Sequence, residues 1–416
     1  MSRVRFMKIV WVGVLVGFLF ILPSASVAAP VVKIGNILPL SGPSATVGIQ
    51  NKNVQDMAAA EINEAGGIKS LGGAKIEMIY TDSKSDPTVG VTEAERLINT
   101  EKVHLLTGCW NSAVTYPTTQ VAEKYGIPFM VPVSVADKIT ERGFKYTFRI
   151  AAKAGWTVRD QYRFLKDVQD EFKTKFTTIA FVYENGDWGT GNADSWKKLA
   201  PEYGYKIVLD EPYPSTSTDM APVVMKIKKA NPDVVLFTSN AADAILLTNT
   251  MAELKVRPKA VVSSAGGHAD PKYLENVKKN GEYFFDLNEW APDLKKPGAK
   301  ETNAKFKKLY GVDLTGETAD GYAAMYVIKD ALERAASLDP KKIRDALAAT
   351  NLKSGPAMIH SFNAVAFDES GQNKHAGLII CQVREMKGQM ELVTVWPKTV
   401  RREGYKLVFP YPPLGK

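Results

Sequence analysis

The sequence predicts an α/β protein made of two Rossmann-like lobes with parallel sheets. Two observations predict it: short apolar runs of strand length alternate with amphipathic segments of helix length, and this alternation occurs twice in succession. Strands that are separated by helices form parallel sheets with helices on their faces. The chain has 416 residues, which is enough for two such lobes.

The first strand–helix unit occupies residues 31–67. A buried strand at 31–38 is followed by a Pro/Gly/Ser turn at 39–43 and by a helix that the Gly66–Gly67 pair ends as a C-cap. One face of this helix carries apolar residues at the 3.6-residue period, namely Val54, Met57, Ala58 and Ile62.

Later segments continue the alternation. In the first half we expect strands at 75–80, 103–108 and 127–131, with helices at 89–99 and 116–125 between them. The second half repeats this order. We expect strands at 178–183, 205–211, 233–239 and 260–264. The helices between them end near 202 or occupy 219–229 and 241–254. The last third is less regular, with helices at 298–310, 319–336 and 340–349 and hairpin-like strands around a turn at 367–373.

Residues 1–28 have the features of a secretory signal peptide. Basic residues precede an apolar run at 9–22, and small residues at 24–29 provide a cleavage site, which we place after Ala28. An uncleaved anchor is the alternative, but the apolar run is shorter than the roughly 20 residues that span a membrane. We therefore expect export to the periplasm and a soluble mature protein.

Charge and composition argue against several function classes. The 53 basic and 45 acidic residues give a formal net charge of +8, and the surplus is spread along the chain. The densest basic cluster, at 295–308, is typical of a solvated helix face rather than of a nucleic-acid site. We therefore expect no nucleic-acid partner.

Cysteines, histidines and glycines give no sign of a metal, a cofactor or a catalytic centre. Cys109 and Cys381 fall in different parts of the predicted fold, so we expect two free buried thiols rather than a disulfide. The histidines have no ligand-like spacing. The glycines at 186, 189 and 191 lack the spacing of a dinucleotide loop, and no Gly-x-Ser-x-Gly elbow occurs. We predict neither metal nor cofactor, and we do not expect an enzyme.

A series of short motifs accompanies the predicted strand ends. They are Leu38-Pro39-Leu40-Ser41-Gly42-Pro43, the helix end Ile62-Asn63-Glu64-Ala65-Gly66-Gly67-Ile68, Gly108-x-x-x-Ser112, Tyr125-Gly126-Ile127-Pro128, Tyr146-x-Phe148-Arg149, the loop from Tyr183 to Gly191, and the turn at 367–373. Their number and order resemble the type I periplasmic solute-binding proteins of the branched-chain amino acid (Leu/Ile/Val-binding) ABC transporter family. The resemblance extends over nearly the whole chain after the signal peptide.

This resemblance implies the type I periplasmic binding protein fold, in which a three-strand hinge joins the lobes. The crossings would then fall near residues 148, 284 and 362. Lobe 1 would comprise residues 29–147 plus 284–362, and lobe 2 residues 148–283 plus 363–416.

The resemblance also implies a function. The chain would be the solute-binding component of an ABC importer, a monomer that traps a small amino acid or a related aromatic or aliphatic carboxylate by hinge closure. It would deliver this ligand to a permease in the membrane. A sensory or regulatory ligand-binding protein of the same fold is the alternative.

Candidate site residues lie beyond the carboxyl ends of the strands, where ligands of open α/β sheets bind. The corresponding loops are 109–112, 133–136, 184–188 and 240–243. Ser112 precedes a predicted helix, where its hydroxyl and nearby N–H groups can bind a carboxylate or simply cap the helix. The resemblance places Ser112 on the family's ligand serine.

Two further candidates depart from the family pattern or allow a second interpretation. Relatives carry Ala-Ala-Thr where this chain has Val133-Ser134-Val135, so the hydroxyl has moved by one position and backbone groups of Val133 and Val135 are the expected contacts. Asp243 lies near the family's acidic residue for a ligand amine. It also begins a predicted helix, where an acid is favoured without any ligand.

Tryptophans occupy several predicted cleft or hinge positions. Trp110 lies in the first ligand loop, Trp156 follows the first crossing, and Trp188 falls where the family has a ligand-touching aromatic residue. Indole offers a flat apolar face with one N–H donor, which suits either a ligand wall or packing between the lobes. Together with the altered second loop, these tryptophans indicate a ligand other than leucine or valine.

Overall fold

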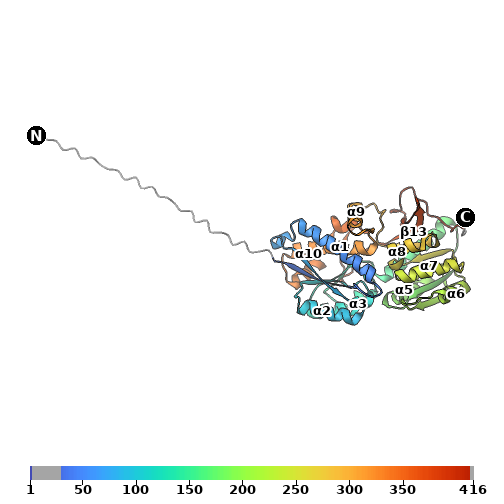
Figure 1. Ribbon diagram of the computed structural model, residues 1–416, viewed down its shortest axis with the longest axis horizontal. Helices are drawn as coiled ribbons and strands as arrows, with labels where there is room; N and C mark the ends of the chain where they lie inside the picture. Colours follow the sequence, from blue (N-terminus) through green and yellow to red (C-terminus); the bar gives the residue numbers. More distant parts are fainter. Residues whose placement is uncertain (2–29, 413–416) are drawn as a thin grey trace.

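The computed structural model describes residue 1 and residues 30–412. The folded part consists of two lobes that lie side by side (Figure 1). The predicted signal peptide, residues 1–28, lies outside the described residues apart from Met1. Within residues 30–412, no helix has both the length and the apolar character that crossing a bilayer requires.

The first lobe contains a five-stranded parallel sheet. Its strands are β1 (Val32–Leu38), β2 (Ile76–Asp82), β3 (Leu105–Gly108), β4 (Phe129–Val131) and β5 (Thr147–Arg149). They are hydrogen-bonded in the order β2-β1-β3-β4-β5. Every residue of β3 and β4 is buried, which is the expected result of apolar runs covered on both faces.

Helices cover both faces of this sheet. They are α1 (Ala45–Glu64), α2 (Pro87–Asn99), α3 (Ser112–Tyr125), α9 (Ala299–Tyr310), α10 (Gly316–Ala335) and α11 (Pro340–Ala348). α1 packs against α10, and α2 packs against α3 on the opposite side of the sheet (Figure 1). A two-stranded antiparallel ribbon, β11 (Asn351–Leu352) and β12 (Val365–Ala366), lies after α11.

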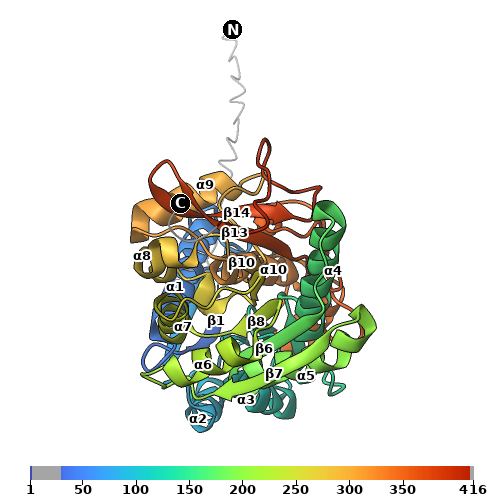
Figure 2. The ribbon, with the colours of Figure 1, turned by 90° about the vertical axis from the view of Figure 1, so that its right-hand side faces the viewer.

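The second lobe contains a seven-stranded mixed sheet. Its strands are β6 (Thr178–Glu184), β7 (Lys206–Tyr213), β8 (Val234–Thr238), β9 (Ala260–Ser263), β10 (Phe285–Asn288), β13 (Ile379–Met386) and β14 (Gln389–Trp396). The order is β14-β13-β10-β9-β8-β6-β7, and the strands from β6 to β10 are parallel (Figure 2). Its helices are α4 (Ala154–Phe172), α5 (Asp187–Leu199), α6 (Ala221–Ala230), α7 (Ala241–Glu253) and α8 (Pro271–Val277).

The regular hairpin of the C-terminal part lies later than the sequence indicates. At the expected turn, 367–373, only an isolated bridge joins Phe367 and Asn373. The hairpin is instead β13–β14, and it turns through Lys387 and Gly388, which both have positive φ. Two successive residues in that conformation match the twist of antiparallel strands.

The chain passes between the lobes three times, and the structure corrects the expected crossing points. The first passage follows β5, close to residue 148. The second follows β10, because residues 285–288 pair with strands of the second sheet; the boundary expected at 284 therefore moves to the end of this strand. The third lies between β12 and β13, at 367–378, and so comes later than residue 362.

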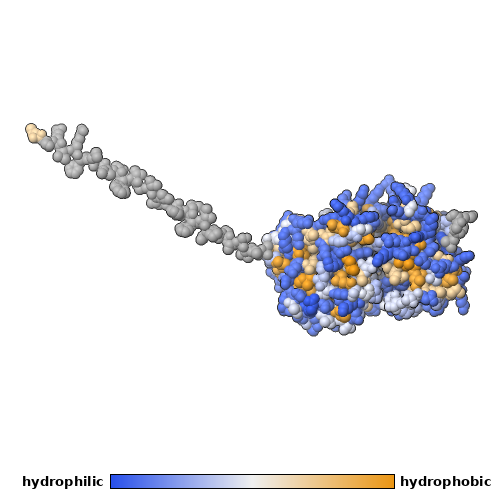
Figure 3. Space-filling model, viewed as in Figure 1, coloured by the Kyte–Doolittle hydropathy of each residue, from blue (hydrophilic) through white to orange (hydrophobic). Residues whose placement is uncertain are grey.

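Each lobe has an apolar core of its own, and Trp196 belongs to that of the second lobe. Trp196 is fully buried and stacks on Phe181, with ring centroids 5.3 Å apart. Cys109 and Cys381 are buried and free, as predicted. The visible surface is mainly hydrophilic, with apolar residues in small patches on both lobes (Figure 3). Lysines of the basic cluster pair with acids, as Lys305 does with Glu61 at 2.7 Å.

Candidate functional site

A cavity of about 210 Å³ lies between the two lobes. Its walls come from the segments that follow β3, β4, β6, β8, β9 and β10, so it lies at the carboxyl ends of both sheets. The first residues of α10 and residues near the start of α1 complete it. This is the place where open α/β sheets bind ligands.

The loop after β3 forms one wall. Cys109 and Trp110 both have positive φ, which is uncommon for residues other than glycine. Ser112 is the first residue of α3, so the helix begins four residues before the expected position, Tyr116. The Ser112 hydroxyl accepts a hydrogen bond from the Ala136 N–H at 3.3 Å. The positive end of α3 thus points toward the cavity with Ser112 and its neighbours.

The loop after β4 lies against the first loop. Val133, Ser134 and Val135 all line the cavity. The Ser134 hydroxyl donates to the Trp110 carbonyl at 2.8 Å and lies 2.5 Å from the Thr115 hydroxyl. Its polar atom therefore joins the two loops, which leaves mainly backbone groups of this segment to face a ligand.

Arg149, at the end of β5, holds the second loop in place. Its guanidinium is fully buried and donates to the carbonyls of Ser134 (3.2 Å) and Ala136 (2.8 Å). It also donates to the Thr140 hydroxyl at 2.8 Å and to Gln372 Oε1 at 2.6 Å. Gln372 belongs to the third passage between the lobes, so one buried side chain connects a cavity loop to the hinge.

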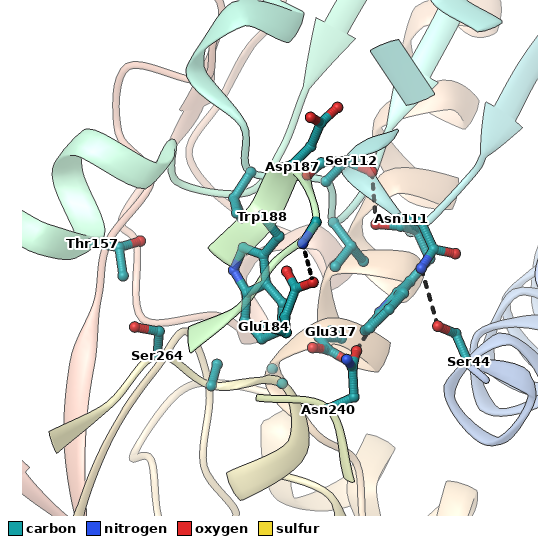
Figure 4. Close-up of a pocket in the computed structure, with 18 of the residues that line it drawn as sticks. Ser44, Asn111, Ser112, Thr157, Glu184, Asp187, Trp188, Asn240, Ser264 and Glu317 are labelled. Carbon is teal, nitrogen blue, oxygen red and sulfur yellow. Dashed lines mark hydrogen bonds between the residues drawn. The ribbon is translucent and has the colours of Figure 1, made fainter. Parts of the chain in front are cut away.

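The second lobe contributes Trp188 to the wall. Trp188 lies in the first turn of α5, and its indole packs on the backbone of Gly266. A Cβ placed on Gly266 would lie 2.3 Å from Trp188 Cη2, and the φ of Gly266 is +58°. Only glycine fits both the conformation and the space at this position. Figure 4 shows the Trp188 ring near the centre of the cavity.

Carboxylates are the charged groups of this cavity. Glu184 accepts hydrogen bonds from the N–H groups of Gly186 and Gly189, both at 2.6 Å, although burial raises its pKa. Asp187 pairs with Lys138 of the first lobe at 3.1 Å. Glu317, at the start of α10, accepts a hydrogen bond from Trp110 Nε1 at 3.0 Å.

Glu289 follows β10 at the second passage between the lobes. Its Oε1 accepts a hydrogen bond from the Ala152 N–H of the first passage at 2.8 Å. Burial raises the pKa of this carboxyl group. Glu289 therefore joins two hinge segments while part of its side chain lines the cavity.

Six of the eight predicted site residues line the cavity, and Trp156 and Asp243 do not. Trp156 packs beside the core of the second lobe, with the Arg159 guanidinium 5.7 Å from its ring centroid. Asp243 is only 1% exposed and accepts a hydrogen bond from the Tyr213 hydroxyl at 2.7 Å. Its position in the first turn of α7 accounts for it without a ligand.

Several lining residues were not predicted from the sequence. The main ones are Ser44, Thr157, Asn288, Glu289 and Glu317. We placed the start of the α10 helix at 319, whereas it begins at Gly316 after the N-cap Thr315. The capping box of Thr315 and Thr318 lacks the Glu or Gln of the usual sequence signature, so threonine as a favoured N-cap residue was the one local signal for a helix start that includes Glu317.

The sequence model of the periplasmic binding protein family matches residues 31–387. The chain belongs to this family. Its members bind solutes and are not enzymes, as expected. The chain is 30% identical over 390 residues to the Leu/Ile/Val-binding protein homolog 7 of Brucella suis. The aligned region covers 91% of this chain and 94% of that protein.

Solved structures share the fold of this family member. The leucine-binding protein LivK of Thermotoga maritima superposes with a TM-score of 0.77 at 22% identity, covering 89% of this chain and all of the other. A solute-binding protein of an ABC transporter from Rhodopseudomonas palustris, in complex with 3,4-dihydroxybenzoic acid, superposes with a TM-score of 0.76 at 20% identity. The superposition covers 87% of this chain and 96% of the other. The predicted type I periplasmic binding protein fold is therefore confirmed.

Within residues 30–412, no three or more His, Cys, Asp and Glu side chains are grouped so that they could hold a metal ion.

Proposed function

We propose that this chain is the extracytoplasmic solute-binding component of an ABC importer. It traps a small amino acid or a related carboxylate, including aromatic acids, between its lobes and delivers it to a membrane permease. The observation that carries the proposal is the cavity itself, which is built from the strand ends of both sheets and receives the first turn of α3. Cleavage after Ala28 would release the protein into the periplasm as a monomer.

The carboxylate of the ligand binds at the start of α3 in this proposal. The first N–H groups of a helix have no partner within the helix, and the helix dipole favours an anion there. The Ser112 hydroxyl adds one donor. Backbone groups of Val133 and Val135 line the same wall.

The apolar part of the ligand lies between Trp110 and Trp188. These two indoles come from opposite lobes, since Trp110 follows β3 and Trp188 begins α5. An aliphatic or aromatic side chain packed between them is removed from water when the lobes approach each other. Leucine, isoleucine and hydroxybenzoates, which are the ligands of proteins with the same fold, have such apolar parts.

Closure of the lobes about the three hinge segments completes the trap. One rigid body would contain the five-stranded sheet with α9, α10 and α11, and the other the seven-stranded sheet with α4 to α8. The ion pair between Lys138 and Asp187, 3.1 Å long, spans the cleft and favours the approach of the lobes. Ligand contacts with both lobes would shift the equilibrium further toward the closed form.

A ligand screen tests this proposal. Thermal unfolding is measured with aliphatic and aromatic amino acids, amides, hydroxybenzoates and small dicarboxylates, because a ligand of the native state raises the melting temperature. A true ligand should also change tryptophan fluorescence and reduce the radius of gyration in small-angle X-ray scattering. Absence of any shift across the screen, with folded protein, would contradict the proposal.

A further inference from the structure

Two carboxyl groups meet where the second passage between the lobes touches α10. Glu289 follows β10 in this passage, and Asp320 lies in the second turn of α10. Their side chains lie within hydrogen-bond reach of each other, and we call them the carboxyl pair. Asp320 is fully buried, and neither of its oxygens receives a hydrogen bond from an N–H or hydroxyl group within residues 30–412. Asp320 therefore lacks the donors that an ionised buried carboxylate requires.

A single proton shared by the carboxyl pair supplies the missing donor. Two carboxylates at hydrogen-bond distance repel each other, whereas a protonated carboxyl group donates to its ionised neighbour. Burial raises the pKa of Glu289 and of Asp320, and for Asp320 the charges of Glu289 and Glu317 raise the pKa further. The pair therefore keeps one proton at a pH at which an exposed carboxyl group has already lost it.

Basic groups around the carboxyl pair do not replace this proton. His360 Nε2 lies 3.3 Å from Asp320 Oδ1, but burial lowers the pKa of His360 to about 4, and Lys296 lowers it further, so the imidazole is neutral near pH 7. The charge of Arg149 lowers the pKa of Glu289 against the larger effect of burial, while the hydrogen bonds of its guanidinium go to other partners. In the part of the chain that the structure describes, no lysine or arginine forms an ion pair with either carboxyl group.

The carboxyl pair connects the two lobes through the hinge. Glu289 Oε1 accepts a hydrogen bond from the Ala152 N–H at 2.8 Å, and Ala152 belongs to the core of the second lobe. Asp320 is part of α10, whose apolar residues belong to the core of the first lobe. A series of contacts thus leads from α10 through both carboxyl groups to the second lobe. The contact between the two carboxyl groups is the one that depends on a bound proton.

We propose that the carboxyl pair makes the arrangement of the lobes depend on pH: with its shared proton bound it holds the lobes together, and without that proton the lobes separate. In the structure the lobes meet across the cleft, where Lys138 and Asp187 are 3.1 Å apart. Loss of the proton leaves two adjacent carboxylates, whose repulsion in a buried site is strong. A hinge movement that carries α10 away from the second passage relieves this repulsion.

The direction of the pH effect follows from the linkage between proton binding and lobe closure. The proton is held more tightly when the two carboxyl groups are together than when they are apart. Raising the pH therefore shifts the equilibrium toward separated lobes, by up to about tenfold per pH unit. The consequence for solute binding rests on the proposed function: a solute enclosed by both lobes binds more weakly as the pH rises through the titration of the pair.

Infrared spectroscopy of the ligand-free protein tests the shared proton. Asp320→Asn and Glu289→Gln each put an amide donor in place of the proton and leave the other group ionised. Difference spectra of the wild type minus either variant should therefore show the C=O stretch of a protonated carboxyl group near pH 7. This band should disappear as the pH rises. Its absence from both difference spectra at every pH would overturn the proposal.

Small-angle X-ray scattering of the ligand-free protein tests the effect on the lobes. The radius of gyration of the wild type should rise between about pH 5 and about pH 10, the range in which buried carboxyl groups titrate. Asp320→Asn, whose amide can donate to Glu289 at every pH, should keep the low-pH value. Asp286→Asn and Glu317→Gln are the matched controls, because burial raises the pKa of these two carboxyl groups as well, and both should retain the rise. A constant wild-type radius, or a rise that persists in Asp320→Asn, would overturn the proposal.

Calorimetry separates failure of this inference from failure of the proposed function. Leucine and 4-hydroxybenzoate are titrated into the wild type and Asp320→Asn at both ends of the pH range, and the variant corrects for titration of the probe itself. A probe that binds should lose at least about tenfold more affinity with rising pH in the wild type than in the variant. Equal losses would overturn the coupling but keep the protein a solute-binding protein. Absence of binding here and across the wider screen would contradict the proposed function, while the scattering of the ligand-free protein would still decide the role of the carboxyl pair.

Discussion

Arg149 Nε donates a hydrogen bond to Gln372 Oε1 at 2.6 Å, although 223 residues separate them in the chain. The same guanidinium holds two carbonyls of the loop that lines the cavity. Gln372 in turn donates to the Ala151 carbonyl at 2.9 Å. The first and third hinge segments and a ligand loop thus form one connected unit, and a movement of the hinge is transmitted to the cavity.

Replacement of Arg149 by lysine should disturb both stability and binding. Lysine keeps the positive charge, but its single ammonium group cannot replace the guanidinium, which donates to Gln372, Thr140 and the loop carbonyls at the same time. We expect a loss of about 2–4 kcal/mol in the free energy of unfolding, because buried polar partners are left without a donor. Denaturant unfolding measures it. Arg163→Lys, at an exposed arginine, is the control and should change stability by less than about 0.5 kcal/mol.

Ser112→Ala tests the carboxylate position. The variant loses one donor to the ligand and should weaken a carboxylate ligand by about 1–3 kcal/mol, the scale of a hydrogen bond to a charged group. Calorimetry with the tightest ligand of the screen measures the change. Ser215→Ala removes another hydroxyl from the cavity lining and serves as control. Equal effects of the two variants would exclude a special role for Ser112.

Gly266→Ala should displace Trp188. The new methyl group would lie 2.3 Å from the indole in a backbone conformation that alanine adopts at a cost of about 1–2 kcal/mol. We expect weaker ligand binding, altered tryptophan fluorescence and a lower melting temperature. Gly191→Ala is the matched control within α5, since nothing lies within 4 Å of an added Cβ there. It should leave binding unchanged and raise stability by up to about 1 kcal/mol.

Asp286 should make stability depend on pH. Burial raises the pKa of Asp286 to about 7, against the hydrogen bonds from Ser263, Ala265 and Asn288. The folded carboxyl holds its proton to a higher pH than the unfolded one, so its contribution to stability is complete below about pH 4 and is lost as pH rises toward 7.

Comparison with Asp286→Asn isolates this contribution. The free energy of unfolding of the wild type should fall relative to the variant by up to about 1.4 kcal/mol per pH unit between pH 4 and 7, and the difference should level off above that range. Chemical denaturation at several pH values measures both curves. Parallel curves would show that Asp286 does not titrate as described.

Ser112 and Glu317 illustrate how far a sequence interpretation of the site extends. Ser112 was found because it follows a buried strand at a short distance along the chain. Glu317 was missed because it meets Trp110 across 207 residues, and because the helix was placed three residues too late. Asp243 and Trp156 were predicted as site residues from their positions in the chain. In the structure Asp243 accepts a hydrogen bond from the Tyr213 hydroxyl, and Trp156 packs against the core of the second lobe.

Local patterns in the chain were sufficient for the alternation of strands and helices, the division into two lobes and the loops that follow the strands. These features depend on periodicity and on turn residues, which involve neighbours in the chain. Long-range packing set the crossing points, the antiparallel β13–β14 hairpin and the direction of each loop side chain. A strand-end residue faces the cavity or the core according to which distant element packs beside it, and that partner is not encoded in its neighbours.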